Sequence, residues 1–173
     1  MSTPGEQKKA ARSGIIDEIE NLVMSGYGKK EDLRALDKAI RDKYYSELMT
    51  LRHRWEKIYL GILESGQSAI GRECKVVIQM IDRLAETVNR ADYGYAPLYD
   101  RVRKVQEQSL NVVLEFDRGL VKNLTDLNQT MANAEDAMRL SAWPSLIKVI
   151  DNLNENFEAF EENWNKRRQA LNS

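Results

Sequence analysis

Residues 61–71 read Gly-Ile-Leu-Glu-Ser-Gly-Gln-Ser-Ala-Ile-Gly, and the conformation of this stretch decides the fold. It lies in the middle of a proline-free segment, Glu31 to Ala91, whose apolar residues recur every three or four positions. That spacing is typical of a helix with one apolar face. The segment therefore predicts either one continuous helix or two helices that meet at a tight corner, Ser65-Gly66-Gln67.

Two arguments favour the continuous helix. The apolar spacing keeps its phase through the glycines, from Ile62 to Ile70 and Cys74, which a corner does not require. In addition, a helix of about sixty residues, roughly 90 Å long, would be covered along its whole length by the helices expected before and after it. In favour of a corner, Ser65 and Ser68 are good N-cap residues. The balance favours one long helix, with a four-helix bundle of unequal helices as the alternative.

The rest of the chain also shows helical spacing, after a polar leader. Pro144 predicts a corner at about Ser141–Ser145, because proline disfavours helix in the residue before it. Further helices are expected over residues 13–24, 97–140 and 144–170. The sequence thus predicts an all-α fold: an elongated antiparallel helical bundle or coiled coil of three to four long helices plus a short N-terminal helix. The predicted organisation is a flexible leader over 1–12 and a single helical-bundle domain over 13–172.

The composition limits the classes of partner. Lysine and arginine total 26 against 27 acidic residues, so the formal net charge is −1. Nucleic-acid binders usually carry a basic excess, so nucleic acid is not expected as a partner. No apolar run reaches the roughly eighteen residues needed for a transmembrane segment, and the polar N-terminus does not resemble a secretory signal. The single cysteine, Cys74, excludes an internal disulfide and is expected to be buried. A cytoplasmic location is the default prediction.

The sequence lacks the motifs of common active sites and metal centres. Its only histidine, His53, lies opposite the apolar stripe, where we expect it to be solvated. One histidine is too few for the di-iron site of a helical bundle or for a zinc site within one chain. Phosphate-binding and nucleotide-binding glycine patterns are missing as well. We therefore predict no enzymatic activity, no catalytic residues, no cofactor and no metal.

A first candidate interaction surface comes from small residues. In a continuous helix, Gly61, Ser65 and Ala69 are spaced by four residues and would form a groove along one face. Such a groove allows another helix to approach closely. We expect a helix crossing or a dimer contact there.

A second candidate is the corner before Pro97, which carries Tyr93, Tyr95 and Tyr99. Tyrosine is enriched among the residues that dominate binding energy at protein interfaces. The alternative is that these tyrosines only cover the edge of the bundle.

A third candidate is an acidic ridge on the last helix, made of Asp151, Glu155, Glu158 and Glu162. It is either a solvated flank or half of a charge zipper with a basic ridge, because flanking charges select partners in coiled coils. The basic ridge proposed for it is Arg34, Lys38 and Arg41. The basic residues that end the same helix, Lys166, Arg167 and Arg168, are expected to complement the helix dipole.

These features predict a non-enzymatic structural or adaptor protein that self-associates through helices and binds protein partners. One alternative is a helical chaperone or export-associated protein that masks a partner helix. Another is a nucleic-acid or membrane-surface binder that uses Arg101, Arg103 and Lys104 or the basic run from Arg52 to Lys57, which the balanced charge makes the least favoured.

Overall fold

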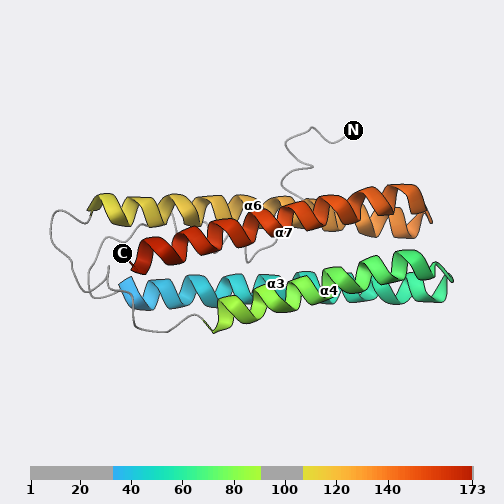
Figure 1. Ribbon diagram of the computed structural model, residues 1–173, viewed down its shortest axis with the longest axis horizontal. Coiled ribbons are helices and arrows are strands. Elements are labelled where there is room, and N and C mark those ends of the chain that lie inside the picture. The colour runs from blue at the N-terminus through green and yellow to red at the C-terminus, as the bar shows by residue number, and fades with distance from the viewer. Residues whose placement is uncertain (1–32, 91–106, 173) are drawn as a thin grey trace.

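The computed structural model describes residues 33–90 and 107–172, and every element within them is helical (Figure 1). The helices form an elongated bundle, which confirms the all-α fold and the antiparallel packing. The short helix expected over 13–24 lies outside the described residues, as do the leader and the first turns expected after Pro97. The four helices are α3 (Leu33–Glu64), α4 (Ser68–Asn89), α6 (Glu107–Arg139) and α7 (Trp143–Asn172).

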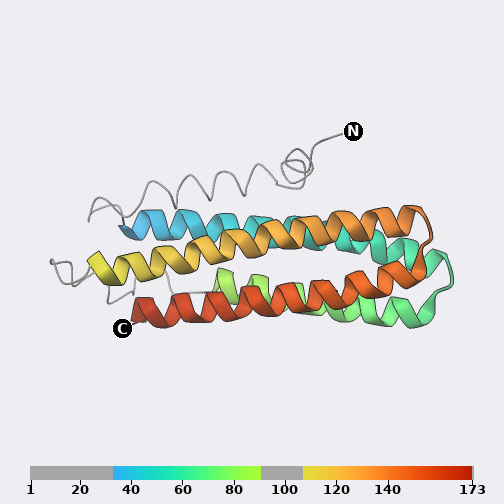
Figure 2. The same ribbon diagram turned by 90° about the horizontal axis from the view of Figure 1, so that it is seen from above.

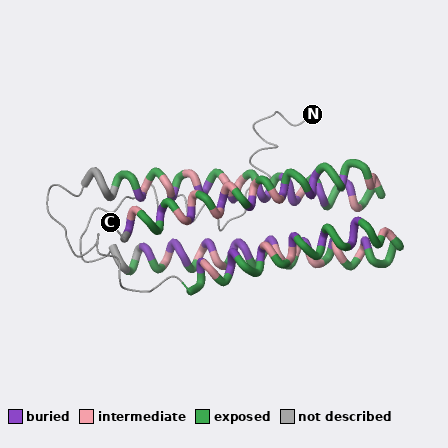
Figure 3. Tube along the Cα trace, in the orientation of Figure 1, coloured by how far each residue is buried: buried purple, intermediate pink, exposed green. Residues whose placement is uncertain are grey.

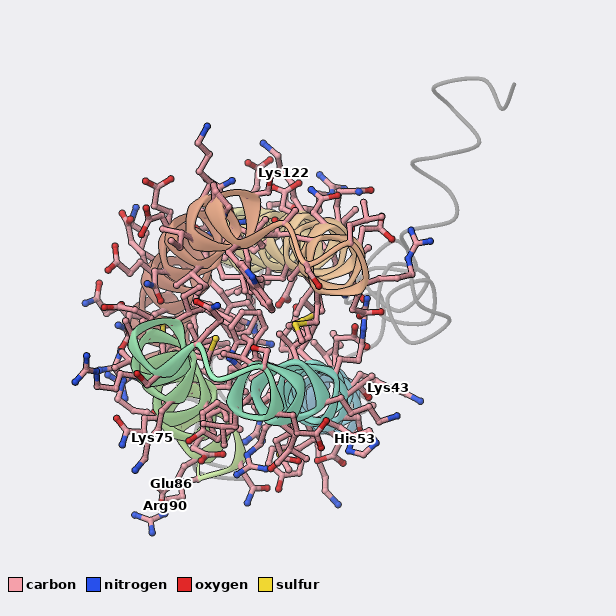
Figure 4. All side chains as sticks on the ribbon, turned by 90° about the vertical axis from the view of Figure 1, so that its right-hand side faces the viewer. Lys43, His53, Lys75, Glu86, Arg90 and Lys122 are labelled. Carbon is pink, nitrogen blue, oxygen red and sulfur yellow. The ribbon has the colours of Figure 1, made fainter. Side chains whose placement is uncertain are left out.

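The helices form two antiparallel hairpins, α3–α4 and α6–α7, which lie on each other. The tight corners of both hairpins lie at the same end of the bundle, here called the corner end (Figures 1 and 2). The opposite end, where α3 and α6 begin, is called the open end. Between the hairpins α3 packs beside α6 and α4 beside α7, so these neighbours run in the same direction (Figure 4).

The prediction of one continuous helix through residues 61–71 is wrong, because the chain reverses at Ser65-Gly66-Gln67. Gly66 has a φ of +79°, in the left-handed region that glycine adopts without strain. The hydroxyl of Ser65 donates a 2.7 Å hydrogen bond to the carbonyl of Ile62, which satisfies a carbonyl at the end of α3. The apolar spacing keeps its phase because the faces of α3 and α4 on both sides of the corner turn toward one core.

The predicted cover of one long helix by its neighbours is wrong for a related reason. Over the described residues three of the helices match closely, with 32 residues in α3, 33 in α6 and 30 in α7. Each is therefore about 45–50 Å long, and they cover one another side by side. Among the described helices α4, with 22 residues, is the shorter one and does not reach the open end. The observed fold is thus the four-helix alternative, in which one described helix, α4, is clearly shorter than the rest.

The second corner lies where Pro144 predicts it. α6 ends at Arg139 and α7 begins at Trp143. Ser141 takes a left-handed φ of 52°, and the amide of Ala142 donates a 2.8 Å hydrogen bond to the carbonyl of Ala137. A bond of this kind satisfies a carbonyl at the end of a helix.

One apolar core runs along the bundle, and Figure 3 shows the buried positions recurring along each helix. The largest buried apolar side chains lie in this core: Trp55, Trp164, Tyr44, Phe157 and Phe160. The ring of Tyr44 meets those of Phe160 and Trp164 edge-on, with centroids 6.2 and 6.0 Å apart. The indole N–H of Trp55 donates to the carbonyl of Cys74 at 2.8 Å and so joins α3 to α4.

Among the helices of residues 33–90 and 107–172, none is long and apolar enough to cross a membrane.

Candidate functional site

Buried charges at the open end form the most unusual feature of the interior. Arg167 on α7 is only 1% exposed. Its Nε donates to Oδ1 of Asp117 on α6 at 2.6 Å, and its Nη2 donates to Oδ1 of Asp37 on α3. One guanidinium therefore joins three helices and both hairpins. The sequence analysis related Arg167 to the helix dipole and did not predict that its side chain lies in the core.

Two further side chains belong to what we call the Arg167 network. Nε of Arg41 donates to Oδ2 of Asp37 at 2.9 Å, and the hydroxyl of Tyr44 donates to Oδ1 of Asp117 at 2.8 Å. The guanidinium of Arg167 also lies 5.5 Å from the ring centroid of Trp164, within cation–π range. Among the described residues the network pairs two arginines with two aspartates, and bonds to the charged forms offset the cost of burying them.

A second polar group joins the hairpins near the middle of the bundle. Nδ2 of Asn128 on α6 donates to Oε1 of Glu47 on α3 at 2.7 Å, and both side chains are buried. Nη1 of Arg54 donates to Oδ1 of the same Asn128 at 3.0 Å, while its Nε pairs with Glu135. The seam between α3 and α6 is therefore held by directional bonds at two levels.

The Arg167 network lies at the level where α4 ends. Arg83 on α4 pairs with Glu161 on α7 at 2.9 Å. Since these two helices run in the same direction, Asn89 at the end of α4 lies about level with Arg167. Beyond this level α4 supplies no further apolar side chains. The polar network thus occupies the part of the bundle where only three of the described helices continue.

No group of three His, Cys, Asp or Glu side chains in the described part of the chain could hold a metal ion. Burial, helped by the charge of Glu73, raises the pKa of the Cys74 thiol to about 12, so the thiolate nucleophile does not form at neutral pH. His53 is exposed and points away from the bundle, as predicted (Figure 4).

The small-residue groove does not exist as one stripe, because the corner interrupts it. Gly61 is half-buried and faces α6: a Cβ built there would lie 2.7 Å from Cε of Met138. Ser65 is part of the corner, and Ala69 is exposed on α4. The close approach at Gly61 is thus to a side chain of the same protein, while a dimer contact at these residues stays a prediction.

The tyrosine corner, with Tyr93, Tyr95 and Tyr99, lies outside the described residues. Its role in binding therefore stays a prediction.

All four carboxylates of the acidic ridge, from Asp151 to Glu162, are exposed. Glu162 pairs at 2.6 Å with Lys166 on its own helix, and this hydrogen bond and charge lower the pKa of the Glu162 carboxyl. In the basic ridge proposed opposite, Arg41 is not exposed but buried in the Arg167 network. A charge zipper that includes Asp151, Glu155 and Glu158 stays a prediction.

Two sets of residues escaped the sequence analysis. Arg167 follows Phe157, Phe160 and Trp164 at the same heptad spacing and precedes Leu171, so its position on the apolar stripe is a signal that could have been used. The second set comprises exposed apolar side chains near the corners: Leu60, Leu63, Leu140 and Ile147. Comparison of the chain with protein-family models, with curated proteins and with solved structures finds no match.

Proposed function

We propose that this protein is a non-enzymatic structural or adaptor protein that self-associates and binds protein partners through its helices. The observation that carries the proposal is the concentration of exposed apolar side chains at the corner end. A cytoplasmic setting, in which the buried Cys74 stays reduced, belongs to the same proposal.

The exposed apolar side chains near the corners come from two helices and the corner between α6 and α7. Leu60 and Leu63, one turn apart on α3, are 58% and 48% exposed. Leu140, which follows α6, is 68% exposed, and Ile147 near the start of α7 is 49% exposed. Single exposed apolar residues are ordinary, but several at one end of a molecule are typical of a docking surface.

The charged surface supports a protein partner over nucleic acid. In the basic run from Arg52 to Lys57, Arg52 pairs with Asp82 and Glu56. Arg54 pairs with Glu135. Because acidic neighbours largely neutralise these arginines, they present little net charge to phosphates.

The test is a variant that makes the corner end polar: Leu60→Gln, Leu63→Gln and Leu140→Gln together. All three side chains are exposed, so the variant should fold normally, which circular dichroism can check. Light scattering coupled to size exclusion, over a range of concentrations, should show an oligomer for the wild type and a shift toward monomer for the variant.

The matched control is Val76→Gln with Val112→Gln, which removes exposed apolar side chains outside the corner set. It should keep the oligomer. A wild type that stays monomeric at all concentrations would contradict self-association. Equal loss of assembly in the variant and the control would contradict an interface at the corner end. Used as baits, the wild type and not the corner variant should capture a protein partner.

A further inference from the structure

The two hairpins could pack on each other in two orientations, and the apolar faces alone distinguish them weakly. In the observed orientation both corners lie at one end (Figure 1). Turning the α6–α7 hairpin end for end would keep its buried face against α3–α4 and leave each hairpin intact. α6 would then lie beside α4, and α7 beside α3. Because apolar burial is not directional, the core would tolerate much of this change.

The number of residues between the hairpins does not by itself exclude either orientation. α4 ends at Asn89 and α6 begins at Glu107, so residues 90–106 join them. At roughly 3.3 Å per residue, this segment could span about 56 Å. Since α4 has only 22 residues, its end lies about 33 Å from the corner end. Chain length alone does not select the orientation.

We infer that the buried polar groups between the hairpins select the orientation with both corners at one end. Turning the hairpin end for end would carry Arg167 to the corner end. The buried α3 residues at that end are apolar, Ile58 and Ile62. Arg167 would therefore lose Asp37, and Tyr44 would lose Asp117.

The bond between Asn128 and Glu47 also favours the observed orientation. Asn128 on α6 would lose Glu47, because the α4 positions that α6 would then face are apolar: Val77, Ile81, Leu84, Ala85 and Val88. Turning the hairpin would thus break three bonds between the hairpins and set polar groups against apolar neighbours, and this loss disfavours the turned orientation. Such groups can add specificity without adding stability.

The test replaces these groups with apolar residues and keeps a partner for Asp37 and for Arg54. The apolar variant carries five changes: Tyr44→Phe, Glu47→Leu, Asp117→Leu, Asn128→Leu and Arg167→Leu. Asp37 keeps Arg41, and Arg54 keeps Glu135. The variant should fold and resist denaturant at least as well as the wild type, but with two orientations of the hairpins.

Spin-label distances report the orientation. In a Cys74→Ala background, one pair of labels at Asp42 and Asn111 marks the open end of α3 and of α6, and both sites are exposed. This pair should give one short distance in the wild type and an additional long one in the apolar variant. A second pair, at Lys57 and Asn111, should change in the opposite direction.

A charge-swapped variant, Asp117→Arg with Arg167→Asp, keeps the pair inside the α6–α7 hairpin. It places a carboxylate against Asp37 only in the observed orientation. It should therefore also populate the turned orientation, and it tests the inference should the apolar variant fail to fold. The control, Leu124→Met with Leu153→Met, alters the same interface without polar change and should keep one distance. Unchanged single distances in both polar variants would overturn the inference.

Discussion

The two helices of the first hairpin bury different chemistry. Within its described residues α3 buries charged side chains beside its apolar ones: Asp37, Arg41 and Glu47. α4, described from end to end, buries only apolar or small residues. Both helices face the same core, yet only α3 is joined to the second hairpin by buried directional bonds.

The difference separates two roles. The apolar face of α4 contributes free energy through burial, which any well-packed apolar neighbour can provide. The polar positions of α3 contribute bonds that only particular partners at particular levels satisfy. α4 therefore mainly stabilises the bundle, whereas α3 also determines how the two hairpins are arranged.

The largest expected effect is at Arg167. Arg167→Met removes the charge that Asp37 and Asp117 share and leaves buried carboxylates without it. We expect a loss of about 3–5 kcal/mol in the free energy of unfolding, measured by urea denaturation. The control on the apolar side, Leu84→Met, conserves volume and should cost less than about 1.5 kcal/mol. Equal losses of unfolding free energy in the two variants would show that removing the buried charge costs no more than changing an apolar side chain.

A smaller effect concerns Cys74, the titratable side chain on the buried face of α4. Burial raises the pKa of its thiol to about 12, above the value near 8.5 expected for an unfolded chain. The unfolded state therefore loses this proton first, and stability falls as pH rises above about 8.5. Relative to Cys74→Ala, the wild type should lose about 2 kcal/mol between pH 8 and pH 10.

The measurement is urea denaturation of both proteins at each pH, so that tyrosines and lysines, which titrate in both, cancel. A constant difference between wild type and Cys74→Ala across this range would mean that the thiol is accessible to water in the folded protein.

The smallest expected effect is at the exposed pair that joins α4 to α7. Arg83→Ala removes the pair with Glu161 and should change the unfolding free energy by less than about 0.5 kcal/mol. The matched change on α3, Arg54→Ala, also removes a donor from buried Asn128 and should cost about 1 kcal/mol more. Thermal melting of both variants compares their losses of stability. A larger loss in Arg83→Ala than in Arg54→Ala would contradict the different roles of α4 and α3.

The two corners show how far the sequence could be interpreted. Pro144 predicted the second corner because proline restricts the residue before it, whatever the rest of the chain does. The first corner depends on Gly66, whose left-handed φ is allowed but not required by its sequence. Its reversal is favourable because α4 then covers α3, a contact between residues far apart along the chain.

The site shows the same limit. Exposure of His53 and burial of Cys74 followed from helical spacing, since each depends on one face of one helix. The pairing of Arg167 with Asp37 joins positions 130 residues apart. Helical spacing places Arg167 on the apolar stripe, but it does not show which acidic side chain lies opposite.

The order of residues alone therefore accounts for the helices, their apolar faces and the corner before Pro144, because each follows from interactions within a few residues. The reversal at Gly66, the stacking of α3 beside α6 and the burial of Arg167 between two aspartates depend on the assembled bundle. Their energies come from contacts between hairpins, which form only when the helices meet.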